Sequence, residues 1–169
     1  MESSPAFRIG HGYDLHRLEA QAPAGPGRPL VIAGVTLEHP MGPVSHSDGD
    51  VAYHAVTDAL LGALGEGDIG QLFPDDDPAW DGADSAIFLR EAAKRMAERE
   101  YRVGNVDVTI ICERPKLAEY KRRMIENIAH LLDCDVQRVN LKGKTHENVD
   151  AVGEGRAVEA HVVALLERA

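Results

Sequence analysis

The sequence predicts a single α/β (α+β) domain, and three observations support that prediction. The chain has 169 residues, of which 44% are hydrophobic and 27% are charged, as is usual for one globular domain. Short segments rich in β-branched residues alternate with longer segments in which apolar residues recur at helical spacing. Neither a repeat nor a low-complexity tract interrupts this order. We therefore expect one domain over residues 1–169, with residues 1–6 as a flexible N-terminus.

Strands are expected where apolar residues alternate with polar ones or cluster in short runs. Residues 7–16 alternate with the period of a strand. A loop rich in Pro and Gly follows at residues 19–29 and predicts a surface excursion. A second strand region covers residues 30–38, with a break near Gly34. The β-branched run at residues 106–112 and the segment at 139–142 are short enough to be buried strands.

Three helices are expected from the spacing of the apolar residues. Residues 50–64 carry one apolar stripe, with Ser47 or Asp48 available as N-cap and with His54 and Asp58 on the opposite, polar face. Two further helices are expected, one that begins after Asp84 and Ser85 and runs to about residue 100, and one over residues 117–132. The last segment, residues 156–168, is ambiguous, because its Ala, Leu and Glu content favours a helix while an alternating pattern also fits a strand.

The charge balance excludes some classes of partner. The chain has 28 acidic against 18 basic residues and a formal net charge of −10, which argues against a nucleic-acid groove or an anionic membrane surface. An anionic ligand would need a bound metal to hold it. The two cysteines form no zinc-ribbon or disulfide pattern. The sequence has neither a membrane-spanning run nor an N-terminal signal, so we expect a cytoplasmic protein, or a plastid one only if a transit peptide has been removed.

Two residues of the first strand are candidate metal ligands. Asp14 and His16 lie two positions apart, so their side chains leave the same face of the strand. A carboxylate and an imidazole are good zinc ligands, and catalytic zinc sites commonly use three protein groups. His54 is the natural third ligand, and Asp58, one turn along the helix, could orient an imidazole. The alternative interpretation is a pair of ordinary polar residues at the end of a strand.

Four loops carry further candidate groups, each with a plain structural alternative. Residues 45–50 offer free backbone N–H groups to an anion, or simply cap the following helix. Residues 73–78 could hold carboxylates toward the hydroxyls of a sugar or polyol, or form a solvated turn. Residues 113–116 follow a strand where ligands often bind, or form a βα loop with Pro at a helix start. Residues 142–147 could bind phosphate or form a turn, while Cys112 is expected in the core.

Several motifs, taken jointly, resemble one known family. In order and spacing, GHGYDLH at residues 10–16, SHSDGDVAYH at 45–54 and GDIGQLFPDDDP at 67–78 resemble the 2-C-methyl-D-erythritol 2,4-cyclodiphosphate synthases of the non-mevalonate isoprenoid pathway. The resemblance continues through GADS, GNVDVTII, RPK and GEG, and covers nearly the whole chain after residue 6. It implies that the 2-phosphate of 4-diphosphocytidyl-2-C-methyl-D-erythritol 2-phosphate attacks the β-phosphorus and expels CMP, without consuming water.

The resemblance also implies roles for individual residues. Asp14, His16 and His54 would hold Zn²⁺ or Mn²⁺ on the β-phosphate, and Glu147 would ligate a Mg²⁺ that bridges the α- and β-phosphates. His46 and Thr145 would be catalytic, by stabilising the transition state. The substrate-binding residues implied in this way are Asp14, Leu15, His16, His46, Ser47, Asp68, Ile69, Gly70, Phe73, Pro74, Asp75, Asp76, Asp77, Cys112, Pro115, Lys116, Leu117, Ala118, Lys144, Thr145, His146 and Glu147.

The implied architecture is a homotrimer with active sites between adjacent subunits. Each subunit would have a mixed four- to five-stranded sheet with helices packed on one face, the sheets lining the trimer axis, and the last segment would then be a strand. The stretch at residues 148–152 is shorter than in many bacterial members and looks more like plastid-type members. Two other functions stay open: a metal-dependent hydrolase of a nucleoside diphosphate ester, and a non-catalytic trimeric binder of nucleotide or metal.

Overall fold

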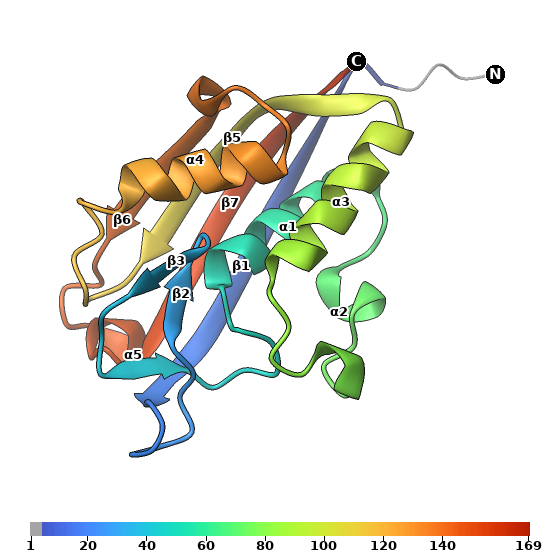
Figure 1. Cartoon of the computed structure of the whole chain (residues 1–169). Coiled ribbons are helices and arrows are strands. Elements are labelled where there is room, and N and C mark those ends of the chain that lie inside the picture. The colour runs from blue at the N-terminus through green and yellow to red at the C-terminus, as the bar shows by residue number, and fades with distance from the viewer. Residues whose placement is uncertain (1–4) are drawn as a thin grey trace.

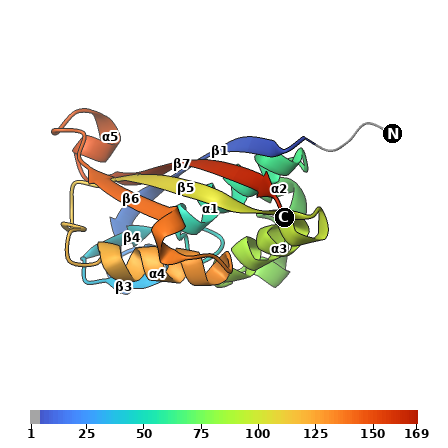
Figure 2. The same ribbon diagram turned by 90° about the horizontal axis from the view of Figure 1, so that it is seen from above.

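A five-stranded mixed sheet with helices on one face makes up most of the fold (Figures 1 and 2). The computed structural model describes residues 5–169. The strands follow the spatial order β4 (Met41–Pro43), β1 (Phe7–Ala20), β7 (Ala157–Arg168), β5 (Tyr101–Ile111) and β6 (Val139–Lys144). Only β5 and β6 pair in parallel. The expected mixed sheet is confirmed.

The helices gather on one side of this sheet, as Figure 2 shows for α1 (Val51–Leu64), α3 (Ala86–Glu98) and α4 (Lys121–Leu131). The expected break near Gly34 is a hairpin of β2 (Leu30–Ile32) and β3 (Val35–Leu37). Ala33 and Gly34 form its two-residue turn with positive φ angles of 48° and 70°, the geometry of hairpin turns. The short elements are α2 (Ile69–Leu72), α5 (Asp150–Gly153) and the 3₁₀ turns Pro78–Trp80 and Val136–Arg138.

The ambiguous last segment is strand β7, which lies at the centre of the sheet. It pairs with β1 on one side and with β5 on the other over almost its whole length. Val158, Ala160, Val162, Ala164 and Leu166 alternate along it and are all fully buried. Burial of this stripe and two ladders of backbone hydrogen bonds outweigh the helix propensity of its Ala, Leu and Glu residues.

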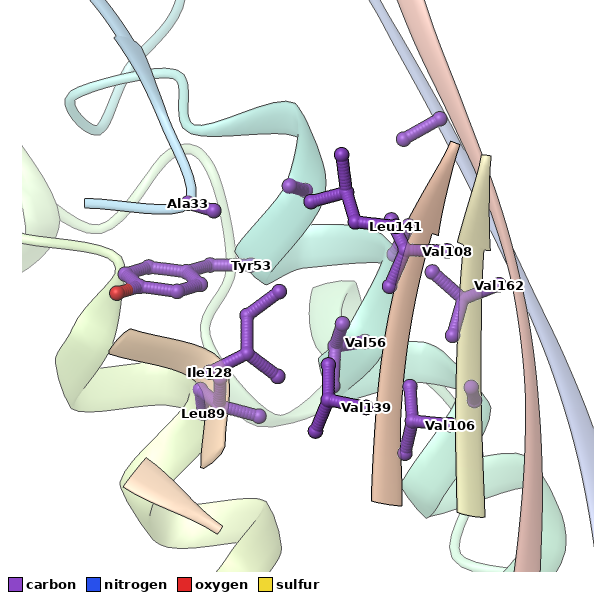
Figure 3. Close-up of a cluster of buried hydrophobic side chains, with 14 of the residues drawn as sticks. Ala33, Tyr53, Val56, Leu89, Val106, Val108, Ile128, Val139, Leu141 and Val162 are labelled. Atoms are coloured by element: carbon purple, nitrogen blue, oxygen red, sulfur yellow. The ribbon is translucent and has the colours of Figure 1, made fainter. Parts of the chain in front are cut away.

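The core lies between the sheet and its helices. Figure 3 shows Val106 and Val108 of β5 beside Val139 and Leu141 of β6, with Val56 of α1 facing them. Helix α1 is buried almost all round, so the expected polar face does not meet solvent. Its residues Thr57 and Leu61 are fully buried.

Several boundaries differ from those expected, for local reasons. Asp50, and not Ser47 or Asp48, caps α1, because its carboxylate accepts from the N–H groups of Ala52 and Tyr53. The same carboxylate accepts from Ala33 and Gly34 and thereby joins the β2–β3 turn to the helix. Residues 117–120 form a turn, so α4 begins only at residue 121.

The strands are longer than the apolar patterns alone indicated. β1 continues to residue 20, and β5 begins at residue 101, with an irregularity between Val103 and Asn105. At the N-terminus, residues 1–4 of the expected flexible segment lie outside the described part. The backbone carbonyls of Pro5 and Ala6 accept hydrogen bonds from Tyr101 and Arg168. Within residues 5–169, no helix has the combination of length and apolar character that a bilayer crossing needs.

The two faces of β1 are chemically distinct. Gly10 and Gly12 face α1, and a Cβ atom at Gly12 would lie only 1.8 Å from the carbonyl oxygen of Ala55. Phe7 and Ile9, on the opposite face, are 61% and 71% exposed. Tyr13 and Leu15 of β1 and Val163 of β7 extend this row of exposed apolar residues. We call these five residues the open apolar face; an apolar patch of this kind is typical of an interaction surface.

The close approach of β1 to α1 makes a direct prediction about stability. We expect Gly12→Ala to lower the free energy of unfolding by about 1–3 kcal/mol, because the backbone of α1 must move to admit a methyl group. Gly62→Ala is the matched control, since Gly62 is an exposed residue of α1 and its Cβ would meet nothing nearer than 3.9 Å. Alanine there should stabilise the helix by about 0.5–1 kcal/mol. Urea unfolding of both variants measures the difference, and equal effects would contradict the proposed contact.

Candidate active site

Three predicted ligands converge between β1 and α1. Oδ2 of Asp14 lies 2.9 Å from Nε2 of His16 and 3.0 Å from Nδ1 of His54. The two imidazole nitrogens are 3.2 Å apart. Asp14 and His16 occupy the helix-facing positions of β1, as their spacing predicts, and His54 reaches them from the first turn of α1. We call these three residues the metal triad.

The donor set fits a divalent cation of the zinc type. Ligand atoms about 2.0–2.1 Å from a tetrahedral zinc lie about 3.3 Å from one another, close to the spacing found here. One carboxylate oxygen and two imidazole nitrogens match the ligand chemistry of zinc, and also of manganese or cobalt. Among residues 5–169 this is the one group of three or more His, Cys, Asp or Glu side chains with converging ligand atoms.

The electrostatics of the triad also favour a cation. Burial raises the pKa of the Asp14 carboxyl, but the hydrogen bonds and charges of His16 and His54 outweigh burial and hold this pKa well below its usual range. Burial lowers the pKa of His54. The hydrogen bond to Asp14 and the charges of Asp14, Asp50 and Asp48 raise it by more than burial lowers it, so the net shift is upward. Positive charge is therefore stabilised between these residues, and a bound cation would displace the imidazole protons.

His54 is held from its other side as well. Its Nε2 lies 2.8 Å from Oγ of Ser85 and 3.1 Å from Oγ of Ser47. Ser85 is fully buried at the start of α3, and its hydroxyl and backbone N–H both contact the carboxylate of Asp48. The sequence reasoning instead expected Asp58 to orient an imidazole, which is wrong: its Oδ1 accepts from the backbone N–H of Ile69, 2.7 Å away.

The triad opens into a cavity of about 490 Å³ that we call the β1 pocket. Of the predicted substrate-binding residues, the pocket is lined by Asp14, His16, His46, Ser47, Ile69, Gly70, Phe73 and Asp75. Ser45, from the candidate 45–50 loop, also lines the pocket, and the lining residues that the sequence reasoning missed are Val44, Trp80 and Phe88. Phe73 packs on Phe88 with 4.5 Å between ring centroids, and Trp80 meets Phe73 edge-on at 5.2 Å. The pocket thus combines a polar floor with an aromatic wall.

Two side chains hold the loops around the β1 pocket. His46 Nε2–H donates to the backbone carbonyl of Asp77 at 2.8 Å, which joins the 45–50 loop to the 73–78 loop. Arg28 donates to the carbonyls of Ser45 and His46 and pairs with Asp81 at 2.6 Å. Arg28 gave no sequence signal, because its partners lie far along the chain. Part of the anion site expected at residues 45–50 is used within the protein, because the N–H groups of Asp48, Gly49 and Asp50 donate to Ala83, Ser47 and Asp48.

A second cavity, of about 310 Å³, lies at the ends of β5 and β6, and we call it the β5–β6 pocket. Seven predicted substrate-binding residues line it: Cys112, Pro115, Lys116, Leu117, Ala118, Lys144 and Thr145. Gly143, from the candidate 142–147 loop, also lines it, as does Lys121, which was not predicted. Cys112 is buried as expected, and burial raises the pKa of its thiol to about 11, so it is not a nucleophile at neutral pH. Pro115 lies in a turn well before α4 and not at a helix start.

The remaining predicted residues line neither pocket. The side chain of Leu15 lies on the open apolar face. Asp68 caps α2, and Asp77 caps the 3₁₀ turn that follows, while Pro74 and Asp76 are exposed. His146 and Glu147 lie in the loop after β6, where the His146 backbone N–H donates to Glu113 at 2.7 Å. Glu147 is exposed and has a left-handed φ of 52°.

The two pockets lie on opposite sides of one chain. β7 separates β1, which carries two of the triad ligands, from β5, which leads into the second pocket. In Figure 1 α2, which contributes Ile69 and Gly70 to the β1 pocket, lies at the right, whereas the segment between β5 and α4, which contributes much of the lining of the β5–β6 pocket, lies at the left. The predicted site residues therefore form two separate groups in the monomer, each with part of the expected binding chemistry.

Comparisons with known proteins identify the family of the chain. A profile of the YgbB family matches residues 7–167. The chloroplastic 2-C-methyl-D-erythritol 2,4-cyclodiphosphate synthase of Oryza sativa subsp. japonica is 54% identical over 96% of this chain and 70% of its own length. The synthase of Syntrophotalea carbinolica is 48% identical over 96% of both chains. The Plasmodium falciparum IspF structure, solved as a CDP complex, is 38% identical, with a TM-score of 0.84 over 98% of this chain and 99% of that one. The chain belongs to the YgbB family, that of the 2-C-methyl-D-erythritol 2,4-cyclodiphosphate synthases.

Proposed function

We propose that the chain converts 4-diphosphocytidyl-2-C-methyl-D-erythritol 2-phosphate into 2-C-methyl-D-erythritol 2,4-cyclodiphosphate and CMP, as a phosphorus-oxygen lyase of the isoprenoid pathway. Its family membership supports the reaction. The observation that carries the location of the chemistry is the metal triad, whose ligand atoms lie 2.9–3.2 Å apart on the floor of the β1 pocket. An acidic protein with a net charge of −10 needs such a cation to bind a substrate with several phosphates.

The reaction needs no nucleophile from the protein. An oxygen of the 2-phosphate forms a bond to the β-phosphorus, and the bond between that phosphorus and the oxygen bridging to the α-phosphorus breaks. CMP leaves with that oxygen and its electron pair, so no water is consumed. The chain itself has to orient the two phosphates and neutralise their charge. A divalent ion on the triad, and a Mg²⁺ held by Glu147, would polarise the phosphoryl oxygens when bound.

The proposed roles of the other residues follow from their places. Ser47 and His46 lie beside the triad and would bind phosphate, and Asp75 would reach the hydroxyls of the erythritol. The backbone at residues 112–118 would bind the cytosine, with Lys144 and Thr145 on the phosphates. The aromatic wall of Phe73, Trp80 and Phe88 would exclude water from one side of the reacting groups.

We propose further that each active site is shared between two copies of the chain in a homotrimer. One chain holds the triad and the β5–β6 pocket on opposite sides, so a second copy has to bring its β5–β6 pocket to the first copy's triad. The open apolar face supports assembly, because a lone subunit would expose its Phe7 and Ile9 to water.

A cytoplasmic location remains a proposal from the sequence, and cell fractionation tests it.

Phosphorus NMR of the purified protein, with Mg²⁺, zinc and the cytidylyl substrate, tests the reaction. The cyclic diphosphate together with CMP supports the synthase. A linear diphosphate ester would instead indicate hydrolysis by water, and no turnover would leave only a binder of nucleotide or metal. Either of those results would overturn the proposed reaction.

Mixing two inactive variants tests the shared site. Asp14→Ala removes a triad ligand and Thr145→Ala removes a group of the β5–β6 pocket, so neither homo-oligomer should turn over. After dissociation and reassembly at equal amounts, about a quarter of the interfaces would combine two intact halves, and activity should return to about that fraction of the wild-type value. If each site lay within one chain, mixing would restore nothing.

A further inference from the structure

The two ring nitrogens of His54 face different partners, so a cation at the metal triad would displace the proton of only one of them. Nδ1 faces the carboxylate of Asp14 and the ring of His16, at 3.0 and 3.2 Å. Nε2 faces the hydroxyl of Ser85 at 2.8 Å, with the Ser47 hydroxyl slightly farther away. Ser85 is fully buried, whereas Ser47 is buried but lines the β1 pocket.

The carboxylate of Asp48 decides the direction of the hydrogen bond between Ser85 and His54. Asp48 accepts the Ser85 backbone N–H at 3.1 Å through Oδ2 and contacts the Ser85 hydroxyl through Oδ1. It also accepts the Asp50 backbone N–H at 3.0 Å, which fixes its own position. An ionised carboxylate can only accept hydrogen bonds, so the Ser85 hydroxyl donates a hydrogen bond to Asp48. The Ser85 oxygen then accepts a hydrogen bond from His54 Nε2–H.

We propose that Asp48 and Ser85 are positioning residues that hold His54 with its proton on Nε2 and its free Nδ1 lone pair aimed at the cation of the metal triad. The contacts run from Asp48 through Ser85 to His54 of the metal triad, and they join the loop before α1 to the start of α3. Outer partners of this kind raise metal affinity about 10- to 100-fold when they fix a ligating imidazole. The inference rests on the proposed function, because it presumes that the triad holds a metal.

Zinc affinity of the metal-free protein, measured by competition with a chromogenic chelator, tests the proposal. Ser85→Thr and Ser85→Val introduce side chains of the same shape, but only threonine keeps the hydroxyl. We expect Ser85→Val and Ser85→Ala to weaken zinc binding about 10- to 100-fold and Ser85→Thr to bind about as tightly as the wild type. Asp48→Asn, which removes the charge that orders the Ser85 hydroxyl, should weaken binding in the same direction.

Thr57→Val is the matched control for the loss of a buried hydroxyl. Thr57 is fully buried in α1, and its hydroxyl donates to the Tyr53 carbonyl at 2.7 Å without touching His54. This variant should keep wild-type zinc affinity even if it is less stable. If Ser85→Thr and Ser85→Val weakened zinc binding equally, the hydroxyl would have no role and the proposal would be overturned.

A measurement on the wild type tests the proposed proton position of His54 even if the Ser85 variants fail to fold. Nitrogen NMR of the zinc-loaded protein should show Nδ1 of His54 bound to metal and Nε2 protonated. The opposite tautomer would overturn the proposal. A wild-type protein that bound no zinc at the triad would instead overturn the proposed metal site, so the two failures are distinguishable.

Discussion

Asp14→Ala should abolish zinc binding at the triad and lower turnover by about 10³-fold or more, the largest effect that we expect from any single substitution. Asp14 supplies the only carboxylate of the triad, and its oxygen lies within 3.0 Å of both imidazoles. Without it, two neutral imidazoles remain and the negative charge that favours a dication is lost. Elemental analysis of the purified variant gives the zinc content, and release of CMP gives the turnover.

Asp58→Asn is the control for this prediction. Asp58 lies one turn after His54 on α1, but its oxygen accepts a backbone N–H, a bond that an asparagine carbonyl can also make. Zinc content and turnover should therefore stay close to the wild-type values. An Asp14→Ala protein that kept its zinc and its activity would show that the triad is not the metal site.

Glu147→Gln should lower turnover by about 10²-fold or more while zinc content and thermal stability stay unchanged. Glutamine keeps the size and hydrogen-bonding capacity of the side chain but removes the charge that a hard cation requires. Glu147 and Asn148 in this loop and Asp150 at the start of α5 have left-handed φ angles of 52–64°. Backbone strain of this kind concentrates at functional sites. At Glu147 it accompanies a carboxylate that stays exposed to solvent.

Glu154→Gln is the matched control, because Glu154 lies just after α5, is exposed, and among residues 5–169 forms an ion pair only with Arg156. It should leave both turnover and its dependence on Mg²⁺ unchanged. The decisive measurement for Glu147→Gln is a Mg²⁺ titration of turnover. If the variant followed the wild-type curve, Glu147 would have no role in binding Mg²⁺, and if it unfolded, its role would be structural.

Local sequence rules put Asp14 and His16 on one face of a strand and His54 on a helix, and the family resemblance marked these three residues as metal ligands. The two-residue spacing of Asp14 and His16 determines the face of a strand, and a helix began where the apolar stripe indicated. The choice of N-cap was beyond those rules, because the SHSDGD segment offers several capping side chains. Asp50 was selected by the tertiary contact of its carboxylate with the β2–β3 turn.

Contacts between distant segments account for what the sequence could not provide. Asp48 and Ser85 are 37 positions apart, and each alone is an ordinary polar residue before a helix. The strand state of β7 likewise depends on two neighbours in the sheet, and not on the residues of the segment itself. The separation of the predicted site into two pockets also follows from topology, since β7, the last strand of the chain, lies between β1 and β5.

The aromatic wall of the β1 pocket gives this protein an intrinsic optical reporter. Trp80 is the only tryptophan in the chain, and its indole lies in that wall, against Phe73 and Phe88. Indole emission responds to the polarity around the ring, so a ligand entering this pocket changes the fluorescence without any label. The β5–β6 pocket has no tryptophan in its lining. Emission from the unmodified protein therefore distinguishes ligands of the first pocket from ligands confined to the second.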